Sequence, residues 1–231
     1  MNGNPDPLIQ NEINGLKVEL EKARKYLPDF RKRTFNGIKE NALVDCLDRA
    51  TDLAEGSLKS AGAGLSASSN ILARGLLDCL FWVRWILSSD ENARRFELQN
   101  RNELIRELKK ALSSTPGLEE ARPSRKRVTQ TILPSIRFQN SPKKMGIKKV
   151  AKDGGLEKVY IRYYGFLLAE SRGNLFDIPS PGDKKWTILA SLAISRAAMA
   201  CVNSIISGWI ISRKKTSVND ILKMVMIQPG D

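Results

Sequence analysis

The chain has no histidine among its 231 residues. This absence excludes Ser-His-Asp and Cys-His nucleophile systems, histidine-bearing zinc sites and any imidazole proton shuttle. An enzyme built on this chain would have to use carboxylates, lysine, tyrosine or a bound metal. The sequence therefore predicts no catalytic residue, no cofactor and no resident metal. It favours a protein that acts by binding over an enzyme.

Cysteine is scarce as well. Cys46, Cys79 and Cys201 are far apart, odd in number and each beside apolar residues, so they indicate neither a disulfide framework nor zinc-ligand spacing. The first ten residues are polar and contain two prolines, unlike a signal peptide. We therefore expect a reducing, cytoplasmic location.

Strand-like alternation is almost missing, since only residues 127–138 have β character. Helical periodicity fills most of the remainder and predicts an all-α helical bundle with a long basic, proline-containing insertion. We expect residues 1–36 to form an N-terminal helical extension, and residues 37–231 to form the bundle, with the insertion at 114–155. The predicted helices cover residues 8–26 (ended by Pro28), 37–60, 70–88, 91–113, 142–152, 156–171, 185–212 and 217–227.

Acidic residues are absent from residues 122–152, a stretch of 31 residues that carries ten Lys or Arg. The whole chain has a net charge of +13, so this stretch supplies most of it. Concentrated positive charge attracts polyanions, and the interspersed apolar residues would let part of the stretch dock on the bundle. We predict contact with nucleic acid, and an inert linker or an acidic protein partner remain alternatives. The candidate nucleic-acid-binding residues are Arg122, Arg125, Lys126, Arg127, Arg137, Lys143, Lys144, Lys148, Lys149 and Lys152.

Arg74 and Asp78 interrupt residues 70–88, the most apolar predicted helix. Four-residue spacing places them on one helix face, so a buried polar pair is expected. Such a pair can fix the packing register or bind an anionic ligand. If the pair is structural, Arg74→Ala should destabilise the fold by about 3–5 kcal/mol.

Two further groups have both a functional and a structural interpretation. Four carboxylates on one face of the second helix could hold Mg²⁺, but a solvated acidic face paired with Arg49 and Lys59 is the simpler reading. Three tyrosines near Arg162 could stack on bases, although tyrosines at such spacing more often belong to the core. These residues are Asp45, Asp48, Asp52 and Glu55, and Tyr160, Tyr163 and Tyr164.

Residues 186–212 are long enough to span a bilayer. Arg196 near the middle costs about 2.5–3.5 kcal/mol on insertion scales, and five serines and Asn203 dilute the apolar character further. Small residues there suit close packing inside a protein. We therefore expect a buried bundle helix, with a membrane-associated effector as an alternative.

The chain also resembles an uncharacterised bacterial all-helical family, a domain of unknown function. The resemblance rests on Arg74, Leu76, Leu77 and Asp78, and on the tyrosine-rich stretch that begins at Tyr160, and it would cover roughly residues 40–210. More distantly, the chain is similar to HEPN helical domains of toxin and defence systems. Their ribonuclease motif requires a histidine, and Arg172-Gly173-Asn174 stands where relatives have one. The resemblance implies a helical fold and a setting in phage defence or a mobile element, without HEPN-type catalysis.

We thus predict a non-catalytic basic protein that binds nucleic acid or a partner that carries it. A helical defence effector that works as a nuclease with carboxylates and arginine is the rival hypothesis. The sequence also leaves a homo-oligomer open.

Overall fold

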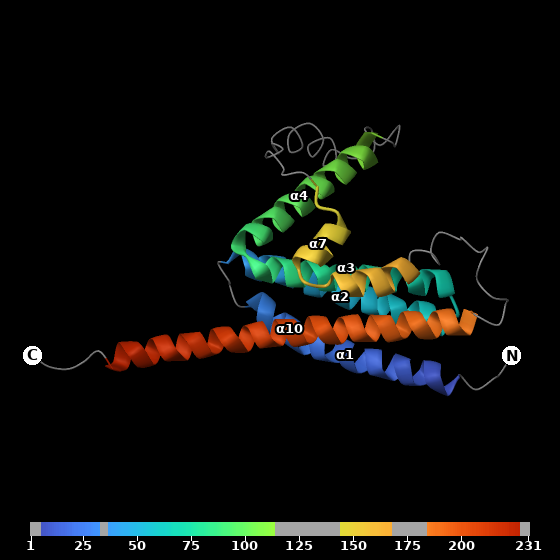
Figure 1. The fold of residues 1–231 in the computed structure, drawn as a ribbon, viewed down its shortest axis with the longest axis horizontal. Helices are drawn as coiled ribbons and strands as arrows, with labels where there is room; N and C mark the ends of the chain where they lie inside the picture. The colour runs from blue at the N-terminus through green and yellow to red at the C-terminus, as the bar shows by residue number, and fades with distance from the viewer. Residues whose placement is uncertain (1–5, 33–36, 114–143, 168–183, 227–231) are drawn as a thin grey trace, which may run out of the picture.

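The computed structural model describes residues 6–32, 37–113, 144–167 and 184–226. Every regular element within these ranges is helical, so the predicted all-α class is confirmed (Figure 1). The elements are α1 (Pro7–Lys32), α2 (Ile38–Gly62), α3 (Ser66–Ser88), α4 (Asp90–Ser113), α7 (Ile147–Asp153), α8 (Glu157–Val159), the π-helical turn η2 (Tyr160–Tyr164) and α10 (Lys184–Met226).

Helix α3 lies at the centre of the bundle and packs against α2, α4, α7 and α10. Leu76, Phe81 and Ile86 are fully buried, and Trp85 is nearly so. Apolar residues on most sides of α3 favour its burial among the other helices. The central buried helix expected from the sequence is therefore confirmed.

Helix α1 runs through Pro28 to Lys32, so the prediction that Pro28 ends it is wrong. Proline has no N–H group, so the carbonyl of Arg24 loses one intrahelical hydrogen bond. Packing offsets that loss, because Leu20 and Ala23 are buried and Leu27 packs against the core. Helix α1 thus contributes directly to the bundle core.

Helix α10 is one continuous helix of 43 residues, whereas the sequence predicts two helices separated near residue 213. The intervening residues, Arg213 to Ser217, include neither glycine nor proline, and lysine and arginine are good helix formers. No local signal therefore ends the helix. It runs past the ends of the other helices in Figure 1.

Polar side chains tie α10 to three other helices. The Ser195 hydroxyl lies 3.2 Å from that of Ser57 in α2, and the Ser191 hydroxyl donates to Asn70 of α3. Asn203 Nδ2 donates to the backbone carbonyl of Glu19 in α1 at 2.8 Å. These contacts satisfy groups that would be costly to bury alone.

Arg196, the charge in the middle of this helix, forms an ion pair with Glu12 of α1 at 2.9 Å. Gly15 makes room for the arginine, since a Cβ there would lie 2.4 Å from Arg196 Cδ. Lys184–Ser212 is the one stretch of the described residues with the length and apolar composition of a membrane span, and 44% of its most apolar window is buried in the protein.

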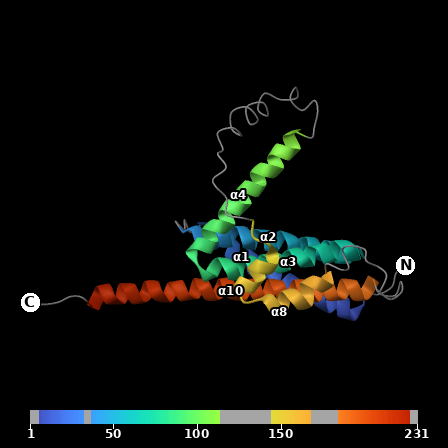
Figure 2. The same cartoon turned by 45° about the horizontal axis from the view of Figure 1, so that its top comes forward.

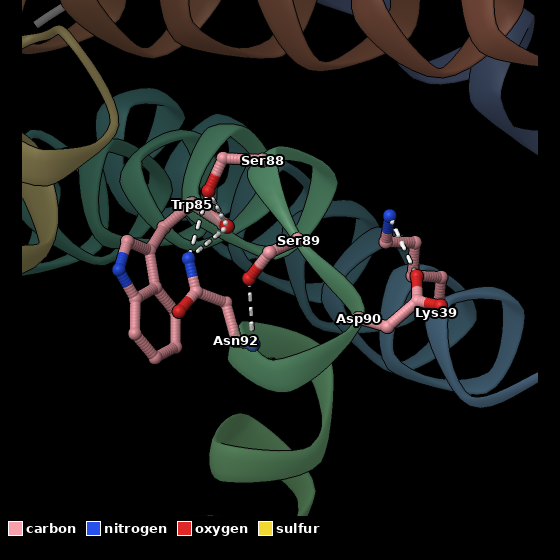
Figure 3. Close-up of polar contacts among 6 residues, drawn as sticks. All are labelled: Lys39, Trp85, Ser88, Ser89, Asp90 and Asn92. Carbon is pink, nitrogen blue, oxygen red and sulfur yellow. Dashed lines mark hydrogen bonds and ion pairs between the residues drawn. The ribbon is translucent and has the colours of Figure 1, made fainter.

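The corner between α3 and α4 is fixed by a cap (Figure 3). Ser89 Oγ accepts the backbone N–H of Asn92 at 3.0 Å, as an N-cap side chain does. Asn92 Nδ2 in turn donates to the carbonyl of Trp85 at 3.1 Å, and Lys39 of α2 pairs with Asp90 at 2.8 Å. Helix α4 consequently leaves the bundle at a steep angle in both Figure 1 and Figure 2.

Two helices end at a glycine with positive φ. Gly155 follows α7 at φ +76°, and the Leu156 N–H closes a six-residue turn onto the Ala151 carbonyl at 2.7 Å. This is a Schellman C-cap, and Gly64 makes the same turn after α2. The sequence correctly places a helix end at Gly154-Gly155.

We expect Gly155→Ala to lower the free energy of unfolding by about 1 kcal/mol, because an L-residue strains at positive φ. Gly208→Ala is the matched control. Gly208 lies inside α10 with nothing within 4 Å of an added Cβ, so alanine should stabilise the helix by about 0.5–1 kcal/mol. Urea unfolding followed by circular dichroism measures both. Equal effects of the two variants would contradict the cap.

Candidate functional site

Helix α7 presents two chemically different faces. Val150 and Ala151 are fully buried, and the helix packs against α3. Lys148, Lys149 and Lys152 are exposed. This end of the basic stretch therefore docks through apolar residues while its lysines face water, as the mixed composition predicts.

The approach to α7 is held by α4. The backbone N–H of Met145 donates to Gln99 Oε1 at 3.1 Å, and Lys144 Nζ lies 2.6 Å from Glu103 Oε1. The hydrogen bond from Lys144 lowers the pKa of Glu103. Lys144 is thus engaged within the protein, which makes it a weaker candidate for a phosphate than the three lysines of α7.

The structure places four of the ten candidate nucleic-acid-binding residues: Lys144, Lys148, Lys149 and Lys152. The other six lie outside the described residues. They are Arg122, Arg125, Lys126, Arg127, Arg137 and Lys143.

Gly154 allows the turn after α7 to lie directly on α3. A Cβ at this position would meet the Val150 carbonyl oxygen at 3.1 Å, and Arg84 Cβ and the Trp85 nitrogen at 3.4 Å. The close approach fixes α7 and α8 on the surface of the central helix. It also brings the start of the exposed Arg84 side chain next to this turn.

Lys158 and Arg162 are further basic residues that lie beyond the candidates predicted in residues 122–152. Both are exposed, Lys158 on α8 and Arg162 on η2. Their four-residue spacing in the sequence already indicates that they share one helix face. The Arg162 guanidinium lies 5.6 Å from the centre of the Tyr163 ring. Residues 144–162 carry six Lys or Arg against two acidic residues, so the positive charge continues past the glycine turn.

Arg74 and Asp78 both belong to a polar cluster with Tyr164 of η2. The Arg74 guanidinium lies 5.2 Å from the centre of the Tyr164 ring, a cation–π distance. Burial raises the pKa of Asp78 to about 6, although the charges of Arg74 and Arg49 and the Tyr164 hydroxyl act in the opposite direction. The buried Oδ1 of Asp78 has no hydrogen-bond partner among the residues that the structure describes. The hydrogen-bonding capacity of the Asp78 carboxylate is therefore only partly used within this cluster.

The π-helical turn sets the positions of the tyrosines. Tyr160 and Tyr164 stack at 4.7 Å between ring centres, and both pack on Phe81 of α3. Tyr164 is buried and Tyr160 is partly buried, so both belong to the core. Tyr163 alone is exposed and remains available for a ligand.

The acidic face of α2 is solvated in part and paired in part. Asp45 and Asp52 are exposed, and Glu55 pairs with Arg24 at 2.7 Å and with Lys59 at 2.8 Å. The surrounding protein and the charge of Asp48 raise the pKa of Asp45. Among the described residues, no group of three acidic, cysteine or histidine side chains could hold a metal ion.

The molecule is thus all-α, with an exposed basic helix and a partly buried Arg–Asp–Tyr cluster. The chain matches the family of unknown function DUF5677 over residues 40–170, more than half of its length, and it belongs to this family. The uncharacterised family expected from the sequence is confirmed, although the match ends before α10. No curated protein and no solved structure matches the chain.

Proposed function

We propose that this protein is a non-catalytic binding module whose basic surface contacts the phosphate backbone of nucleic acid. The observation that carries the proposal is the division of α7, with Val150 and Ala151 buried and Lys148, Lys149 and Lys152 exposed. Docking holds the three ammonium groups on a folded surface. Their charge is then oriented before a ligand arrives, which reduces the ordering cost of binding.

The chemistry of the surface suits phosphates better than bases. Lysine is a flexible point charge that pairs with a phosphate without reading base identity. Lys158 and Arg162 extend the charge, and Tyr163 beside Arg162 offers one exposed ring for stacking on an unpaired base. Binding should therefore depend strongly on salt and weakly on sequence.

We expect the full chain to bind oligonucleotides with a log–log salt slope near −4, if about half of the ten basic side chains in residues 122–152 contact phosphates. Replacing Lys148, Lys149 and Lys152 by alanine should weaken binding to every sequence and flatten the slope by up to about 2.7 on duplex. Fluorescence anisotropy with duplex and single-stranded oligonucleotides between low and moderate salt measures both quantities.

The matched control removes three exposed basic residues elsewhere: Lys17, Lys25 and Arg94 become alanine. It lowers the net charge equally but leaves α7 intact, so it should change the slope little. The proposal is wrong if the chain does not bind at low salt, or if the two triple variants weaken binding equally.

The two rival functions have less support from the described residues. A carboxylate-based nuclease would need the three aspartates Asp45, Asp48 and Asp52 to face Arg74 or Arg172. Asp45 and Asp52 are instead exposed to water, and Arg74 packs over the ring of Tyr164. Arg172 lies outside the described residues. A membrane effector would need α10 to leave its hydrogen bonds to Ser57 and Asn70. The implied setting in phage defence or a mobile element, and the cytoplasmic location, stay predictions.

A further inference from the structure

A groove of about 450 Å³ runs between α3, the α8–η2 segment and α10. Each of the three contributes one stripe of residues to the walls. The stripes repeat at helical spacing, so a single face of each helix is turned toward the groove. They are Leu77, Leu80 and Arg84; Leu156, Val159 and Tyr163; and Ala193, Ile194, Ala197, Ala198, Cys201 and Ile205.

The walls are apolar except at a few points. Among the described residues that line the groove, Arg84 is the one charged residue and none is acidic. Its volume falls in the range of about 300–1,000 Å³ that is typical of small-molecule sites, which are mostly apolar with a few polar groups that set orientation. An apolar slot with a single cation is complementary to a ligand with an apolar body and one anionic group.

The polar and apolar ends of the groove can be assigned. The Asn70–Ser191 contact joins α3 to α10 near the start of both helices, and Arg84 lies beside the Gly154 turn that precedes α8. Arg84 therefore stands at the end where α8 begins. The α10 stripe from residue 193 to residue 205 extends about 18 Å at the helical rise. The α10 wall of the groove is therefore longer than the other two walls, and the cation lies at one end.

We propose that this groove binds a long-chain carboxylate, a free fatty acid, with the acyl chain along α10 and the carboxylate at Arg84. The small residues Ala193 and Ala197 leave the space that the chain would fill. The inference does not depend on the lysines of α7, because none of them lines the groove; Tyr163, the ring offered above for base stacking, is shared by both surfaces.

Cys201 supplies a reporter inside the groove. It is exposed, whereas Cys46 and Cys79 are buried. Burial raises the pKa of Cys79 to about 12 and raises that of Cys46 well above its ordinary value, so both thiols should react slowly. The rate at which Cys201 reacts with an aromatic disulfide reagent therefore measures access to the groove.

We expect dodecanoate, added below its micelle concentration, to slow the Cys201 reaction in a saturable way. Calorimetric titration of the full chain with C8, C10 and C12 carboxylates should show about fourfold tighter binding per added methylene. Arg84→Gln should weaken dodecanoate binding about tenfold and leave dodecanol unchanged, because only the carboxylate loses a charge-assisted contact. Ala197→Phe should abolish binding of both ligands by filling the groove.

Two controls separate the groove from surface effects. Lys148→Ala removes a basic charge outside the groove, and Ser204→Phe adds a ring at an exposed α10 position outside its lining. Both should bind dodecanoate like the unmodified chain, with unchanged melting temperatures. The proposal is overturned if binding shows no dependence on chain length, or if Lys148→Ala weakens it as much as Arg84→Gln. It is also overturned if sedimentation equilibrium shows a dimer that protects Cys201 without ligand, since a second copy would then fill the groove.

Discussion

Phe81→Ala is expected to lower the free energy of unfolding by about 3–5 kcal/mol. Phe81 is fully buried in α3, and its ring lies 6.1 Å from that of Tyr160 and 6.3 Å from that of Tyr164. Alanine removes the apolar surface of the ring and leaves a cavity that rigid helices on several sides cannot close. The contact between the central helix and η2 would weaken most.

Urea unfolding measures this loss of free energy. Phe166→Ala is the matched control, because it makes the same Phe-to-Ala change at another position. Phe166 is 44% exposed, so its truncation should cost well under half as much. Near-ultraviolet circular dichroism should also change in Phe81→Ala, because the stacked tyrosines lose their support. Similar losses in the two variants would mean that η2 does not pack on α3 as described.

Arg74→Ala should destabilise the protein by about 3 kcal/mol at pH 8, toward the lower end of the range expected for a broken buried pair. Arg74 is half-buried, and its guanidinium covers Tyr164 and attracts the carboxylate of Asp78. Removing it leaves Asp78 in a buried site with less compensation for its charge. Urea unfolding at fixed pH gives the difference.

The effect of Arg74→Ala should depend on pH. The folded-state pKa of Asp78, about 6, is higher than that of an unfolded aspartate, so the folded protein binds the proton more tightly. The contribution of the protonated Asp78 carboxyl group to the free energy of unfolding is fully present below about pH 4. It is lost as the pH rises through 6, by roughly 2–3 kcal/mol. Loss of Arg74 raises the pKa of Asp78 further, so the variant should be penalised less at pH 5 than at pH 8.

Asp78→Asn provides the matched test. It removes the titrating group, so it should remove this part of the loss of stability between pH 4 and pH 7. Combined with Arg74→Ala, it should recover much of the stability lost at pH 8, because no buried charge remains to be compensated. A double variant whose losses simply add at both pH values would show that the two residues do not interact.

Local patterns were sufficient for most helices but not for their limits. Periodicity located α2, α3 and α4, and the glycine pair located the end of α7. Pro28 led to a wrong helix end, because the hydrogen bond that proline removes is visible in the local sequence. The compensating burial of Leu20 and Ala23 depends on contacts with other helices, which the local sequence does not show. The continuity of α10 past residue 212 was missed because a run of basic residues resembled a break.

The candidate sites show the same limit. Sequence spacing placed Arg74 and Asp78 on one face, yet Tyr164 joins them from 86 residues beyond Asp78 in the chain. The sequence also did not show that Lys144 forms an ion pair with Glu103 of α4, which distinguishes it from the other clustered lysines. The groove was not predictable from the sequence. Each of its three stripes has the pattern of an ordinary core face, and only the packing of α3, α8–η2 and α10 brings them together.

Helix α10 affects how this protein behaves in a gel-filtration column. At 1.5 Å per residue, its 43 residues form a rod about 65 Å long, and Figure 1 shows that rod running beyond the remaining helices. A projecting rod increases friction, so the 25.8 kDa chain should elute earlier than a compact protein of the same mass. Calibration against spherical standards would then suggest a dimer when the particle is a monomer. Light scattering, which measures mass directly, is the appropriate way to assign its subunit number.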